Sequence, residues 1–174
     1  IAMIVKLIGA SLILIVCTVI GFEISSRYRQ RPKQIRQFRT ALQALEAEIM
    51  FGHIPLKEAS IRLSKQLPSP INQFFDHFSR LLDISDIQVK TAWNNSLENI
   101  TGFTDLKKSD IEILSQFGET LGKHDRYQQQ KQIKLTMAHL EREEDEALDL
   151  QGKYEKMVKN LGFLIGLLII ILLI

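Results

Sequence analysis

The chain has 174 residues and a formal net charge of +2, which fits one small domain with flanking segments. Its only cysteine, Cys17, lies inside an apolar run, which excludes a disulfide framework and a cysteine-based metal site. Hydrophobic residues are concentrated at the two ends of the chain, whereas the middle is polar and mildly acidic. We therefore expect a polar middle domain between two apolar segments.

The first apolar segment is an uninterrupted run over residues 7–22. Together with residues 1–5 it reaches about 20 residues, enough for a helix across a hydrocarbon core of about 30 Å. A cleaved signal peptide is the alternative, but no small-x-small cleavage site follows, and the next segment is strongly basic. We interpret residues 1–26 as an N-terminal transmembrane helix.

A basic run follows this segment and sets its orientation. Its members are Arg27, Arg29, Arg31, Lys33, Arg36 and Arg39. Lysines also precede the second apolar segment, and basic residues beside membrane segments stay on the cytoplasmic side. Residues 27–160 are therefore expected to form a cytoplasmic domain, with both termini across the membrane. We expect the basic run to contact anionic lipid at the membrane surface. The alternatives are a solvated helix face and a nucleic-acid patch, and we expect no nucleic acid as a partner.

The middle of the chain has helical periodicity and no strand-like alternation, so we expect an all-α bundle of about six helices. Pro32 fits the first turn of a new helix, and Gly52 fits its end. A second helix is expected from near Pro55 to just before Pro68, and a third begins directly afterwards.

The third helix places Phe74, Phe78 and Leu81 on one face, which predicts that these side chains are buried together. Ser85 or Asp86 is expected to cap a fourth helix.

The fifth helix is expected to begin with a capping box formed by Ser109 and Glu112. Gly118 predicts close packing against another helix, and Gly122 predicts the end of the fifth helix. Asp125 is expected to cap the last helix.

The last helix runs from about Asp125 to Ile174 without a proline. Its apolar face follows alternating steps of three and four residues: Ile133, Met137, Leu140, Ala147, Tyr154, Val158 and Leu161. Residues 161–174 carry no polar side chain, so the helix is expected to continue into a C-terminal transmembrane segment. These 14 residues span about 21 Å, less than a hydrocarbon core of about 30 Å. Gly162 and Gly166 form a small-residue face that predicts association with a partner's helix or with a second copy, although chance spacing is the alternative.

An acidic run occupies the middle of this helix, at Glu141, Glu143, Glu144, Asp145 and Glu146. A solvated helix face is one interpretation. The other is docking of a basic patch on a cytoplasmic partner, for which Glu141, Glu143 and Glu144 are the candidate contacts. The run is dense enough to repel itself along a helix, so we expect some compensation by opposite charge.

No pattern of residues indicates an enzyme. The four histidines do not form a metal-ligand spacing, and no Walker A or GxSxG sequence is present. We predict no catalytic residue, metal or cofactor. A membrane-tethered interaction module is favoured, and a membrane-bound signalling or sensor protein is the alternative.

Several stretches resemble the stage III sporulation protein AB family of endospore-forming Bacilli. They are RPKQIRQFRTALQALEAEI from Arg31, FGHIPLKEA from Phe51, KTAW from Lys90, FGETLGKHDRYQQQKQIKL from Phe117 and LGFLIGLLIIILL from Leu161. The resemblance covers nearly the whole chain, and the stretch from Phe117 is its most specific part.

This resemblance implies a place in the mother-cell membrane around the forespore. The family belongs to a channel or secretion-like complex that joins the two cells. Its cytoplasmic domain is similar in fold to the platform protein of type II secretion and type IV pilus systems. The resemblance thus implies a platform role, in which the chain recruits a cytoplasmic secretion-type ATPase and links it to membrane partners.

Overall fold

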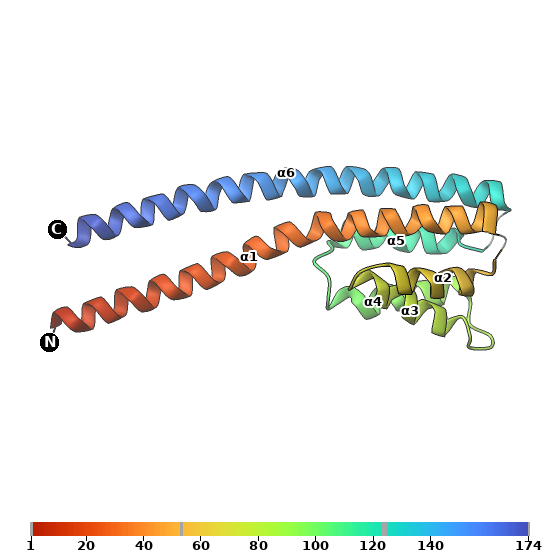
Figure 1. Cartoon of the computed structure of the whole chain (residues 1–174), viewed down its shortest axis with the longest axis horizontal. Helices are drawn as coiled ribbons and strands as arrows, with labels where there is room; N and C mark the ends of the chain where they lie inside the picture. Colours follow the sequence, from red (N-terminus) through yellow and green to blue (C-terminus); the bar gives the residue numbers. More distant parts are fainter. Residues whose placement is uncertain (1, 53, 123–124, 174) are drawn as a thin grey trace. The chain divides into compact units, whose positions relative to one another are not determined.

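The computed structural model describes residues 2–52, 54–122 and 125–173, and Figure 1 shows their helices. Six α-helices and one π-helical turn follow one another: α1 (Ala2–Ala47), η1 (Glu48–Gly52), α2 (Leu56–Gln66), α3 (Ile71–Leu81), α4 (Val89–Thr101), α5 (Lys108–Thr120) and α6 (Arg126–Leu173). These described ranges contain no strand, so the predicted all-α class is confirmed. The predicted long last helix is also present, as the 48 residues of α6.

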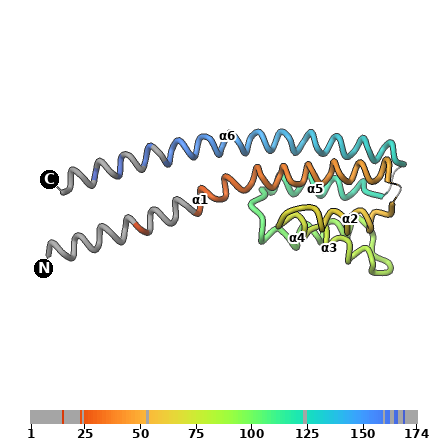
Figure 2. The backbone as a smooth tube through the Cα atoms, in the orientation of Figure 1, coloured from red at the N-terminus to blue at the C-terminus, as the bar shows by residue number. Residues whose placement is uncertain are grey.

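The chain forms two compact units. The terminal unit consists of α1 up to Arg29 and α6 from Ala147, and within it the ring of Tyr28 stacks on that of Tyr154 with centroids 4.5 Å apart. The central unit contains residues 30–146. In the central unit, successive short helices from α2 to α5 contact one another, and α5 runs beside α1 (Figure 2).

The first long helix does not restart at Pro32, so that prediction is wrong. Pro32 lies inside α1, which continues to Ala47 before the π-helical turn ends at Gly52. An interior proline removes one backbone hydrogen bond and costs roughly 3 kcal/mol. Pro32 is buried together with Arg31, and the contacts of this segment within the central unit offset that cost.

Two helix starts also differ from the sequence-based expectation. The fourth helix begins at Val89 with Gln88 at the N-cap position, so neither Ser85 nor Asp86 caps it. Asp86 instead has a φ of 73°, in the left-handed region, and belongs to the turn before the helix. The fifth helix begins at Lys108, and the predicted Ser109–Glu112 box does not form. Instead the carboxylate of Asp110 accepts the backbone N–H of Lys107 at 2.7 Å.

The cap of the last helix agrees with the sequence. A carboxylate oxygen of Asp125 accepts the backbone N–H of Gln128 at 2.8 Å, as an N-cap residue does. Before it, Gly122 has a φ of 77°, a conformation that glycine adopts without the steric cost of a Cβ. Its position just after α5 confirms the predicted helix end.

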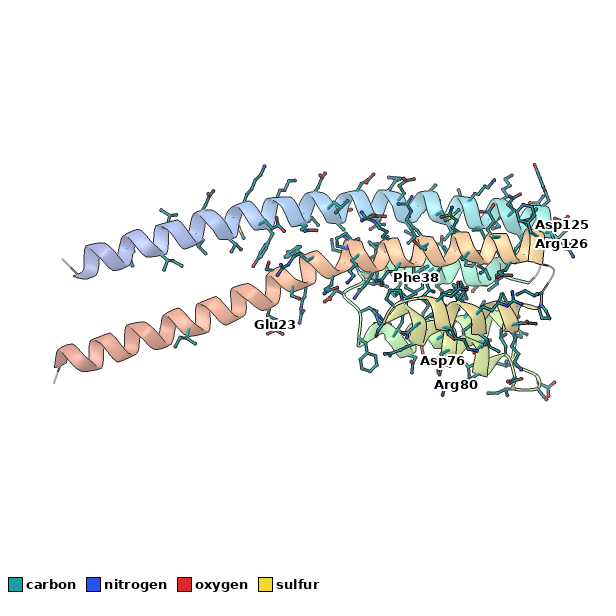
Figure 3. All side chains as sticks on the ribbon, in the orientation of Figure 1. Glu23, Phe38, Asp76, Arg80, Asp125 and Arg126 are labelled. Atoms are coloured by element: carbon teal, nitrogen blue, oxygen red, sulfur yellow. The ribbon has the colours of Figure 1, made fainter. Side chains whose placement is uncertain are left out.

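The core of the central unit is built around Trp93, the only tryptophan of the chain. Its ring is surrounded edge-on by four phenylalanines, at centroid distances from 4.7 to 6.3 Å: Phe74, Phe75, Phe78 and Phe117. The indole N–H donates to the carbonyl of Leu114 at 2.8 Å, so the ring is buried with its polar atom satisfied. Phe38 on α1 joins the cluster through Phe74 (Figure 3), with centroids 5.4 Å apart.

Two of the three residues predicted to be buried on α3 are fully buried, namely Phe74 and Phe78. Leu81 is only partly buried, because α3 ends there. Gly118 confirms the predicted close packing: a Cβ at this position would lie 2.3 Å from Cδ1 of Trp93.

In the described ranges, none of the helices carries an apolar stretch of the length that a bilayer crossing requires. The transmembrane segments expected over residues 1–26 and 161–174 stay predictions. Gly162 and Gly166 lie in α6, but their packing is outside the described side chains.

We predict that Phe78→Ala lowers the free energy of unfolding by about 3–5 kcal/mol, because it opens a cavity beside Trp93 in a close-packed core. Urea unfolding followed by Trp93 fluorescence measures the change. The matched control is Phe103→Ala, which removes an exposed phenyl ring and should change the free energy by no more than about 0.5 kcal/mol. Equal effects of the two variants would contradict this assignment of the core.

Candidate functional site

The most concentrated chemistry in the central unit is an ion network between α1, α5 and α6. It brings together two sets of residues that the sequence suggested were separate surfaces, the basic run and the acidic run. Glu144 shares the buried face of α6 with Leu140, because residues four apart lie on one side of a helix. Its charge therefore points into the unit and requires a partner there.

The inner part of the network is a two-point contact between Arg31 and Asp110. Nε of Arg31 donates to one carboxylate oxygen at 2.9 Å, and Nη2 donates to the other at 2.8 Å. The Arg31 side chain is 5% exposed and that of Asp110 is 0% exposed. Nη2 also donates to Glu143 at 2.7 Å. Such forked pairs are among the stronger hydrogen bonds in proteins and fix the orientation of both groups.

A second part of the network surrounds Glu144, whose side chain is 4% exposed. One carboxylate oxygen accepts a hydrogen bond from Nε of Arg36 at 2.7 Å, and the other accepts one from Nη1 of Arg39 at 2.7 Å. Arg39 also forms an ion pair with Glu141 at 2.9 Å. Two arginines of α1 thus neutralise the carboxylate of Glu144, which lies on the buried, hydrophobic face of α6.

The start of α5 connects the network to the rest of the unit. The hydroxyl of Ser109 donates to Glu143 at 2.9 Å, and Nζ of Lys107 donates to Glu146 at 3.3 Å. Asp110 has two roles, since it binds Arg31 and caps α5 through the N–H of Lys107. Sequence reasoning missed Asp110, although an acid in the first turn of a helix is a recognised capping signal.

The network favours the charged form of its arginines. Burial of the Arg31 guanidinium opposes its charge, but the hydrogen bond and charge of Asp110, with two nearby glutamates, outweigh burial and raise the pKa of Arg31 above its ordinary value. Burial likewise lowers the pKa of Arg39, but its hydrogen bond to Glu144 and the charges of Glu141 and Glu144 outweigh burial and raise it. Because the folded-state pKa lies above the unfolded value, these contacts stabilise the fold at every pH at which the arginine of the unfolded chain is protonated. This contribution is lost only as pH rises through the folded-state pKa.

The structure places the six predicted membrane-surface residues differently from one another. Arg31, Arg36 and Arg39 bind acids of α5 and α6 within the central unit, although the Arg36 side chain is itself 65% exposed. Arg27, Arg29 and Lys33 are also exposed. Arg31, Arg36 and Arg39 therefore supply compensation that the acidic run requires.

The three predicted partner contacts also differ in accessibility. Glu143 and Glu144 are engaged within the unit, and Glu144 is almost completely buried. Glu141 is 57% exposed while it pairs with Arg39. Of the three, Glu141 is the residue that presents its carboxylate to solvent.

Elsewhere in the ranges that the structure describes, no cluster of His, Cys, Asp and Glu has a metal-binding arrangement. His77 contacts the hydroxyl of Ser96 at 3.1 Å between Nδ1 and Oγ, which satisfies both groups within the helix bundle. The ion network has the character of a structural joint, because its charged groups are paired with one another.

Comparison with known proteins identifies the family. The family model described as "Stage III sporulation protein AB" matches residues 6–174. The chain belongs to the stage III sporulation protein AB family. The resemblance inferred from the sequence is thus confirmed, and with it a role in sporulation.

Relatives within the stage III sporulation protein AB family match along almost their full length. The "Stage III sporulation protein AB" of Bacillus subtilis (strain 168) is 54% identical over 168 residues, which cover 97% of this chain and 98% of the relative. A solved structure of a protein with the same description is 52% identical, with a TM-score of 0.68. That match covers 71% of this chain and 98% of the solved chain. The name of the family refers to a stage of sporulation and to no reaction.

We predict that Asp110→Asn lowers the free energy of unfolding by about 3 kcal/mol, because it leaves the buried Arg31 without its closest counter-charge. Urea unfolding measures the effect. The control is Asp76→Asn, which breaks an exposed pair with Arg80 on the outer surface of α3 (Figure 3) and should cost about 0.5 kcal/mol or less. A change below about 1 kcal/mol in Asp110→Asn would show that the pair contributes little.

Proposed function

We propose that this chain is a membrane-anchored platform of the complex that joins mother cell and forespore. In this role it links a cytoplasmic secretion-type ATPase to membrane partners and catalyses no reaction itself. Membership of a sporulation family supports the biological setting. The apolar runs at both ends of the chain support anchoring in the mother-cell membrane around the forespore.

The observation that carries the platform role is the ion network. It binds α1 and α6 to α5 within the central unit, and these two long helices are the elements whose sequences continue into the apolar runs. A displacement applied to the central unit therefore acts on both long helices together. This is the coupling that a platform between a motor and membrane partners requires.

The distribution of basic residues supports the proposed topology. The first apolar run is followed by basic residues, and the second is preceded by Lys153, Lys156 and Lys159. Both basic flanks belong to the middle of the chain, so the positive-inside rule places the middle in the cytoplasm and both termini on the opposite side.

We propose that the ATPase docks on the exposed acidic stripe of α6. Glu141 and Asp145 are four residues apart in the central unit, so they lie along one side of the helix, and both are exposed. Opposite charge on a partner is steered toward such a stripe. Glu143 and Glu144, although part of the same acidic run, contribute by holding α6 in place.

Charge reversal tests this docking surface. The variant Glu141→Lys/Asp145→Lys should bind the purified ATPase more weakly, with a shallower dependence on salt, in calorimetry at several salt concentrations. The control is Glu98→Lys, which reverses an exposed charge on α4. Both variants should unfold close to the wild type because Arg31 and Glu144 keep their partners. An affinity and salt dependence equal to those of the control would exclude the stripe as the docking surface.

A second candidate function is a membrane-bound sensor that relays a signal along α6. It is favoured by the continuity of this helix from Arg126 to Leu173. The two functions differ in their partner, since a sensor requires a downstream effector whereas a platform requires the ATPase. Association of the C-terminal segment through Gly162 and Gly166, with a second copy or with a partner's helix, is compatible with both functions and is part of the proposal.

A further inference from the structure

The loop between α4 and α5 holds an aromatic side chain out of the bundle. Phe103 is 70% exposed, although the loop around it is anchored at several points. Its backbone N–H donates to the carbonyl of Ile100 at 2.9 Å, and the N–H of Asp105 donates to Oε1 of Gln34 at 2.8 Å. With Lys107 bonded to Asp110, the backbone of this loop is fixed at both ends and on α1. The exposure of Phe103 is therefore a property of an ordered loop.

This loop lies at the end of the central unit where the chain enters and leaves it. The central unit begins at Gln30 and ends at Glu146. Gln34, one turn after the beginning, binds the loop, and Nζ of Lys107 donates to Glu146 itself. The loop is thus next to both points from which the chain continues toward its apolar runs.

The chain length between the loop and the first apolar run is short. From residue 22, where that run ends, to residue 34 there are 12 residues, or about 18 Å of helix. The headgroup layer on one side of a bilayer takes up roughly 5–7 Å of this length. The remaining length is roughly 11–13 Å, which is an upper limit on how far residue 34 can lie from the bilayer surface. The Debye length at physiological salt is about 8 Å, so lipid charges act on this end of the unit once it lies against the surface.

The side chains around Phe103 suit a bilayer surface. Lys107 ends the loop and Lys108 begins α5, with its side chain 91% exposed. Lys33 is exposed beside Gln34 on α1. Lys107 pairs with Glu146, and Lys108 pairs with Glu112. Exposed pairs of this kind contribute little, so the lysines can exchange a carboxylate for a lipid phosphate.

We propose that Phe103, Lys107 and Lys108 form a peripheral contact site for an anionic bilayer surface. An exposed phenyl ring can be buried at the boundary between headgroups and acyl chains, and lysines are attracted to anionic lipids. The site would hold the entry end of the central unit against the membrane and limit its tilting. This inference rests on the membrane anchoring proposed above, and it assigns a function to a loop outside the ion-paired basic run.

A fluorescent probe on the full chain tests this site in lipid nanodiscs. Gly102→Cys, in a Cys17→Ser background, places the probe next to Phe103 at a position where a Cβ has no atom within 4 Å. Lipids with a nitroxide headgroup serve as the quencher, with or without phosphatidylglycerol in the bilayer. The matched control is Ala47→Cys in the same background, at the exposed far end of α1. The unsubstituted chain labelled at Cys17, with a nitroxide on the lipid tail, reports insertion of the first apolar run.

We expect the Gly102→Cys probe to lose fluorescence in discs with phosphatidylglycerol, and the Ala47→Cys probe to lose little. Adding Phe103→Ser and Lys108→Glu to the Gly102→Cys chain should restore most of the lost signal. If the Cys17 label is quenched but the Gly102→Cys probe behaves like the control, the contact site is wrong and the anchoring stands. If the Cys17 label is not quenched either, the proposed anchoring fails and the contact site fails with it.

Discussion

The forked ion pair between Arg31 and Asp110 is the constraint on which the central unit depends. Both side chains are buried, and an isolated buried charge costs several kcal/mol. The cost is offset only when α1 and α5 lie at the one relative position that joins the guanidinium to the carboxylate. A buried pair is weak evidence for stability by itself, and in some proteins such a pair selects one register among several. We infer that the pair fixes how the short helices sit on α1.

The apolar core and the ion network make different contributions to the fold. The aromatic cluster around Trp93 removes large rings from water, and Gly118 lets α5 approach the indole closely. The hydrophobic effect is non-directional, whereas charged hydrogen bonds of 2.7–2.9 Å require particular positions of donor and acceptor. The core therefore supplies most of the driving force, and the network determines which arrangement of the long helices results.

Local signals in the sequence predicted the elements whose causes are local. The period of the apolar residues located α2, α3 and α6, and Asp125 identified the start of α6. The same reasoning failed at Pro32, where contacts within the folded unit override the proline. It also failed at the start of α5, where Asp110 in place of Ser109 and Glu112 caps the helix through Lys107, three residues away. The second partner of Asp110 is Arg31, 79 residues distant.

The candidate site also depends on contacts between residues far apart in the sequence, which local patterns do not predict. The basic and acidic runs were visible in the sequence, and the density of the acids indicated that they require compensation. That Arg31, Arg36 and Arg39 supply it depends on pairings across 105 to 112 residues, which periodicity and spacing do not reveal. A residue that seems to face lipid or a partner can therefore be part of the interior. Family membership was recognisable because it rests on stretches of sequence, which do not require the fold.

The central claim is that the two runs form one internal joint, and a charge-exchange cycle tests it most directly. Glu144→Arg alone and Arg36→Glu/Arg39→Glu alone should each lower the free energy of unfolding, since like charges then meet in a buried place. The combined variant restores opposite charges, and we expect it to recover a large part of the loss in urea unfolding followed by Trp93 fluorescence. If the combined variant instead loses the sum of the two single losses in free energy of unfolding, the basic and acidic runs do not form one internal joint and are separate surfaces.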